Sequence, residues 1–107
     1  MNDQIVIQNI IRECTETNGF LVKLHAYKVF DNERYRLLID YLSCYRTMLD
    51  DRPEMNRSVA GCLLALQQEI DNQINLHLQG RRSDREADDI AAAYEELWQL
   101  INDIMKI

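Results

Sequence analysis

Apolar residues recur at alternating intervals of three and four along most of this 107-residue chain, and this spacing constrains the fold most strongly. The clearest run lies near the C-terminus and consists of Ala87, Ile90, Tyr94, Leu97, Ile101 and Ile104. These intervals place side chains on one face of an α-helix. Ser83 and Glu86 have the spacing of a capping box at the start of this run. We therefore predict a helix from residue 84 to about 105.

The preceding segment is predicted to be a second long helix. Asp51 is placed to cap its N-terminus, with Pro53 near the first helical position, and Gly80 is placed to end it in a left-handed conformation. Gly61 lies inside the pattern, where it would either permit a close helix crossing or mark a later helix start. The predicted core line consists of Val59, Leu63, Leu66, Ile70 and Ile74, extended by Leu76 and Leu78.

The N-terminal half contains two further helical patterns. Residues 33–49 carry a regular apolar line, and Asp31 or Asn32 would cap its start. That line consists of Tyr35, Leu38, Leu42, Tyr45 and Leu49. Near the N-terminus, a helix ending around Asn18-Gly19 is predicted, because an Asn-Gly pair suits positive φ. Its apolar residues are Val6, Ile7, Ile10, Ile11 and Cys14.

Residues 20–30 are the ambiguous part of the chain. Phe20, Leu24, Tyr27 and Phe30 would share a helical face, but the valines and aromatic residues also suit a strand. We favour a helix because a lone strand would have no partner elsewhere in the sequence.

Long amphipathic helices joined by short connections predict an all-α fold, an antiparallel helical bundle of four to five helices. Because the chain contains one proline and three glycines, long irregular linkers are not expected. We therefore predict that residues 1–107 form a single domain.

Charge and cysteine usage restrict the partners and the compartment. The net charge of −6 disfavours nucleic acid, and no apolar run is long enough for a membrane span or a secretory signal. Cys14, Cys44 and Cys62 have no metal-ligand spacing, so we predict buried free thiols in a reducing cytoplasm.

Catalytic motifs are largely missing from the sequence. His25 and His77 have no acidic residue three positions before them, as a di-metal bundle site would need. Two pairs of carboxylates, Glu13–Glu16 and Glu86–Asp89, lie too far apart to complete a magnesium motif, and no glycine-rich phosphate loop is present. We expect no cofactor, no metal site and no catalytic residues.

These observations favour a non-enzymatic protein-interaction module, such as an adaptor, an inhibitor or immunity-type partner, or a regulatory subunit. The alternative is a small helical enzyme or ligand-binding bundle, with a site built from the Tyr, His and Arg residues of segment 25–57.

The helix at 33–49 carries more apolar residues than one packed face requires. The surplus includes Leu37, Tyr41, Cys44 and Met48, which we predict to bind a partner, most simply a second copy of the chain in a homodimer. The alternative is that segment Phe20–Phe30 folds over this face within one chain.

Overall fold

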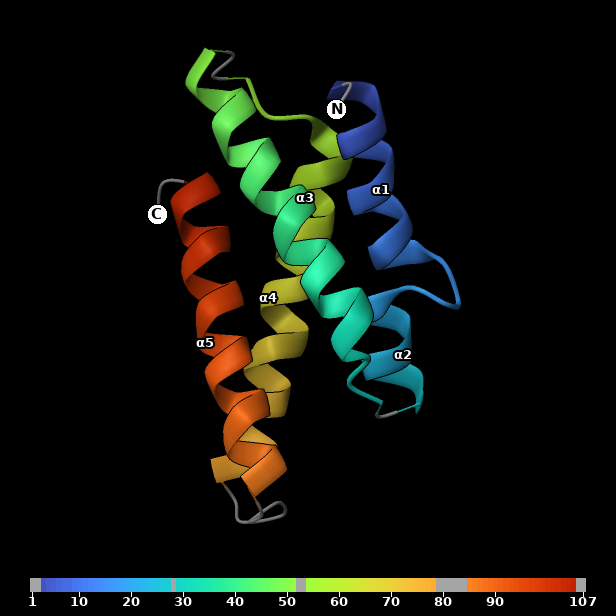
Figure 1. Ribbon diagram of the computed structural model, residues 1–107, viewed down its shortest axis with the longest axis vertical. Coiled ribbons are helices and arrows are strands. Elements are labelled where there is room, and N and C mark those ends of the chain that lie inside the picture. The colour runs from blue at the N-terminus through green and yellow to red at the C-terminus, as the bar shows by residue number, and fades with distance from the viewer. Residues whose placement is uncertain (1–2, 28, 52–53, 79–84, 106–107) are drawn as a thin grey trace.

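The computed structural model describes residues 3–27, 29–51, 54–78 and 85–105 as five helices and their connections, with no strand in these ranges. The helices are α1 (Asp3–Thr15), α2 (Phe20–Tyr27), α3 (Asn32–Asp51), α4 (Arg57–Leu78) and α5 (Arg85–Met105) (Figure 1). The predicted all-α helical bundle is confirmed. The ambiguous segment is helical from Phe20 to Tyr27, as we favoured.

The four long helices form a square bundle. Helix α1 packs against α3 and α4, and α5 also packs against α3 and α4. Consecutive long helices run in opposite directions, as the chain colours in Figure 1 show. Within the described ranges, α3 and α4 make no backbone contact, so they lie diagonally opposite each other. As a result, α1 and α4 are neighbours that run in the same direction.

Most residues of the predicted apolar lines are buried in one continuous cluster to which all five helices contribute. This cluster packs against partly buried members of the same lines, namely Ile7, Ile11, Ile74 and Ile90. Tyr27 is exposed, so its predicted place on the apolar face of segment 20–30 was wrong. In α5 the buried residues of the predicted apolar run are Tyr94, Leu97, Ile101 and Ile104. Leu100 is also buried, although the predicted run did not include it. In α3 all five predicted core positions are buried, and in α4 Val59, Leu63, Leu66 and Ile70 are buried.

The start of α4 differs from the prediction. Asp51 belongs to the end of α3, and α4 begins at Arg57. Asn56 caps α4, because its Oδ1 accepts a hydrogen bond from the Val59 amide at 3.1 Å. The Asn56 amide in turn donates to the buried Tyr45 hydroxyl at 2.8 Å. Asp51 as the cap was therefore wrong, since a side chain on α3 fixes the connection and the helix start.

Several sequence expectations at helix ends lie outside the described residues. These are the positions of Pro53 and Gly80 and the capping box between Ser83 and Glu86, together with the side chains of Leu76 and Leu78. Gly61 is described, and a Cβ added there would meet nothing within 4 Å. It therefore does not permit a close helix crossing.

Gly19 is needed for close packing and not for positive φ. Helix α1 ends at Thr15, earlier than predicted, and Gly19 has no positive φ. A Cβ at Gly19 would lie 2.6 Å from the Arg12 carbonyl oxygen and 2.7 Å from that of Glu13. Only glycine fits this close approach between the connection and the last turn of α1.

Phe30, in the connection from α2 to α3, packs against aromatic rings of the bundle. The Phe30 ring centroid lies 5.4 Å from that of Phe20, 5.3 Å from Tyr35 and 5.6 Å from Tyr94. Asp31 then caps α3, with Oδ1 accepting from the Arg34 amide at 3.1 Å. Segment 20–30 thus packs on the first turns of α3.

Candidate functional site

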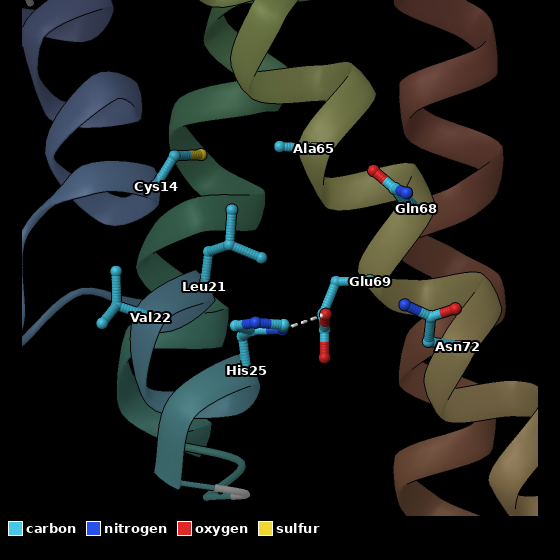
Figure 2. Close-up of a pocket in the computed structure, with 8 residues that line it drawn as sticks. All are labelled: Cys14, Leu21, Val22, His25, Ala65, Gln68, Glu69 and Asn72. Carbon is cyan, nitrogen blue, oxygen red and sulfur yellow. Dashed lines mark hydrogen bonds and ion pairs between the residues drawn. The ribbon is translucent and has the colours of Figure 1, made fainter.

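An open groove lies between α2 and α4 and has a volume of about 400 Å³ (Figure 2). The last turn of α1 closes one end of it, as Cys14 shows. Its lining residues are Cys14, Leu21, Val22, His25, Ala65, Gln68, Glu69 and Asn72. This volume falls in the range of sites that bind small ligands or single side chains of a partner.

The groove exists because α2 is short and is fixed at its start to α1 and α3. The buried Glu13 carboxylate accepts a hydrogen bond from the Phe20 amide through Oε1 at 3.1 Å. Its Oε2 accepts another from Arg34 Nη1, also at 3.1 Å. Phe20 and Leu24 then point into the core. The side of α2 that carries Leu21 and His25 faces α4 across the groove (Figure 2).

A small polar network lies on the α4 side of the groove. The Glu69 side chain is only 7% exposed, and its Oε2 lies 2.8 Å from His25 Nδ1. Its Oε1 accepts a hydrogen bond from the Gln73 amide nitrogen at 2.9 Å. The His25 side chain, by contrast, is 69% exposed. The network therefore consists of a buried carboxylate whose partner across the groove is an accessible imidazole.

The sequence analysis did not identify Glu69 and Gln73, although their spacing along α4 indicates that they lie on its buried face. Cys62, Leu66, Glu69 and Gln73 follow one another at intervals of four, three and four, and all four residues are buried. Two polar residues on a core line of α4 therefore mark the place where the bundle interior opens towards the groove.

The residues that we predicted to bind a partner lie on α3, away from the groove. Tyr41 and Met48 are half-buried and pack against the core. Tyr41 also lines a small polar hollow between α1 and α3, of about 190 Å³. Leu37 is half-buried, and Cys44 is exposed.

The cysteines are free thiols in two different environments. Cys14 and Cys62 are buried as predicted, but Cys44 is exposed. A buried Cys44 was therefore a wrong expectation, because Cys44 lies outside the face that α3 buries against α1 and α5.

The described Tyr, His and Arg residues of segment 25–57 are not gathered into one site. Tyr35 donates to the Ala93 carbonyl at 3.0 Å and to the Glu96 carboxylate, and burial together with Glu96 raises its pKa. Arg46 pairs with Asp103 at 3.3 Å on the surface. Among the members of this set that the structure describes, only His25 lines the groove.

Two kinds of feature are absent from the described residues. No three His, Cys, Asp or Glu side chains in this part of the chain gather as metal ligands. None of its helices combines the length and hydropathy of a membrane span. The side chain of His77 lies outside the described set.

Comparisons with family models, with curated proteins and with solved structures found no match to this chain.

Proposed function

We propose that the chain is a non-enzymatic protein-interaction module that receives a short segment of a partner protein in the groove between α2 and α4. The observation that carries the proposal is the groove itself, a hollow with apolar side chains on both walls and one buried carboxylate. Adaptors, inhibitors and regulatory subunits all act through surfaces of this kind.

The composition of the groove supports binding over catalysis. Its acid–base pair is His25 and Glu69, and the second oxygen of Glu69 is already held by Gln73. Three of the residues on which the enzyme alternative depends, Tyr35, Arg34 and Arg46, make their contacts elsewhere in the bundle. A reaction would need further reactive groups around the same hollow.

The charge of the groove indicates the chemistry of the partner. None of the Lys and Arg side chains that the structure describes lines it, so the described walls supply no lysine or arginine positive charge to Glu69. An arginine or lysine of a partner would add that charge, displacing the exposed His25 from Glu69. The net charge of −6 favours the approach of the same basic segment.

The apolar part of the groove would hold a neighbouring aliphatic side chain. Leu21, Val22 and Ala65 provide carbon surface on both walls. We therefore propose a partner segment in which an aliphatic residue lies next to an arginine or lysine. Nucleic acid is a poor occupant because its phosphates would meet Glu69.

A displayed library of random peptides tests the proposal. We expect selection on the wild-type protein to enrich peptides with adjacent aliphatic and basic residues. Ala65→Tyr fills the groove from an exposed position and should abolish binding of the selected peptides. Ala92→Tyr, on the exposed side of α5, is the matched control and should leave binding unchanged.

Glu69→Gln separates charge from shape. This substitution keeps the size of the side chain and an acceptor oxygen, so peptides held through the carboxylate should bind at least tenfold more weakly. Enrichment of acidic or purely aliphatic peptides would contradict the proposed partner chemistry. Equal binding by the Ala65→Tyr variant would contradict the site.

Two further elements of the proposal are independent of the groove. The free thiols support a reducing compartment such as the cytoplasm. Self-association through the α3 face with Leu37 and Cys44 remains a prediction, because the exposed thiol and the half-buried leucine leave apolar surface there.

A further inference from the structure

One contact bridges the two walls of the groove and joins a titratable side chain of α2 to the buried carboxylate of α4. His25 Nδ1 lies 2.8 Å from Glu69 Oε2 (Figure 2). A carboxylate only accepts hydrogen bonds, so Nδ1 is the donor and carries the hydrogen. An imidazole can carry a hydrogen there in its neutral and in its protonated form. The contact can therefore form in both states of the ring, but its strength depends on the charge of the ring.

Few other titratable groups of the described residues face His25 from the helices around it. The remaining groove residues of α4 are uncharged, and Cys14 of α1 is a buried thiol, which stays neutral at neutral pH and below. No described residue of α3, which also packs against α2, lines the groove. On α2 itself, the Lys23 ammonium is held by Asp31 at 2.7 Å. Glu69 is thus the charged partner of the imidazole in the described walls.

We propose that His25 makes the groove sensitive to pH, because a protonated His25 keeps Glu69 from a basic partner and a neutral His25 gives it up. This inference rests on the partner chemistry proposed above. A partner arginine or lysine has to replace His25 at Oε2, since Oε1 already accepts a hydrogen bond from Gln73 at 2.9 Å. Protonation makes the bond from His25 to Glu69 charge-assisted and therefore stronger. A displaced imidazolium would in addition repel the incoming cation.

Binding of the partner and protonation of His25 therefore oppose each other. A basic partner should bind more weakly as the pH falls, and its binding should in turn expel a proton from the ring, because such coupling is reciprocal. Histidine side chains change their charge between about pH 5 and 8, so the loss of affinity should lie in this range. Couplings of ordinary size predict an affinity that falls at least about fivefold across it. The partner would thus be released when its surroundings become acidic.

The experiment uses a peptide selected on the wild-type protein that contains one arginine and has blocked termini. The peptide contains no histidine and no acidic residue, so its own charge does not change over the range tested. Calorimetry measures its affinity at about pH 8, 6.5 and 5.5. We expect the affinity for the wild type to fall with pH. We also expect proton release near pH 6.5, seen as a binding enthalpy that varies with the ionisation enthalpy of the buffer.

His25→Gln is the test variant, because glutamine keeps a hydrogen-bond donor for Glu69 and has no charge at any pH. Its affinity for the peptide should be the same at all three pH values, and its binding should release no proton. His77→Gln, which removes the other histidine of the chain, is the matched control and should keep the pH dependence of the wild type.

The possible outcomes separate this inference from the proposed function. A wild-type affinity that does not change with pH, or an equal loss of affinity in His25→Gln, would overturn the role of His25. The proposed function would stand in both cases, because the peptide still binds at the highest pH. A peptide that binds the wild type at none of these pH values would overturn the proposed function and this inference with it.

Discussion

Replacing Glu13 by alanine should destabilise the protein far more than the same change at Glu16, although both are glutamates near the end of α1. The Glu13 carboxylate is 4% exposed and accepts hydrogen bonds from the Phe20 amide and from Arg34. In the alanine variant the buried Phe20 amide loses its acceptor, which costs about 1–3 kcal/mol. The lost pair with Arg34 adds at most about 1 kcal/mol, because the arginine side chain is 42% exposed and solvent screens it. The expected total is about 2–4 kcal/mol.

Glu16→Ala is the control. Glu16 pairs with Arg12 at 3.7 Å, and both side chains are exposed, so its loss should cost less than about 0.5 kcal/mol. Urea titrations followed by circular dichroism give both free energies of unfolding. Equal values for the two variants would show that Glu13 does not hold α2 to α1 and α3.

Three further predictions concern packing and association. Leu97→Ala should lower the free energy of unfolding by about 2–5 kcal/mol because Leu97 is fully buried, whereas Glu95→Ala, at an exposed position, should lower it by well under about 1 kcal/mol. Urea titrations that give the reverse order would show that the buried face of α5 was assigned wrongly. Gly19→Ala should lower the melting temperature because its Cβ would meet two carbonyl oxygens. Gly61→Ala should raise the melting temperature, because alanine stabilises α4 by about 0.5–1 kcal/mol and its Cβ meets no other atom. A shift in the same direction for both variants would contradict this account. Sedimentation should show self-association of the wild type at high micromolar concentration and its loss in Leu37→Glu with Cys44→Asp, and a monomeric wild type would end the homodimer hypothesis.

The helices of this protein are largely predictable from the sequence because their signal is local. The spacing of Tyr94, Leu97 and Ile101 identifies the buried face of α5, and the same reasoning holds for α3. The helix boundaries are less predictable where a distant side chain determines them. Tyr45 on α3 binds the Asn56 amide ahead of α4, and nothing near Asp51 in the sequence records that contact.

The groove could not be predicted, since it depends on how α2 is placed against α4. The spacing of Glu69 and Gln73 marks them as core positions, but only the fold brings His25 opposite Glu69. The groove also requires α1 and α4 to lie side by side, and the chain order alone does not determine which long helices of a bundle are neighbours.

An amide NMR titration of the isotope-labelled protein with a selected aliphatic–basic peptide tests the central claim most directly. The account predicts saturable shifts at Leu21, Val22, Ala65 and Glu69, on the two walls of the groove, and no such shifts in the Ala65→Tyr variant. Shifts centred on Leu37 and Cys44, or an unchanged spectrum at saturating peptide, would contradict it.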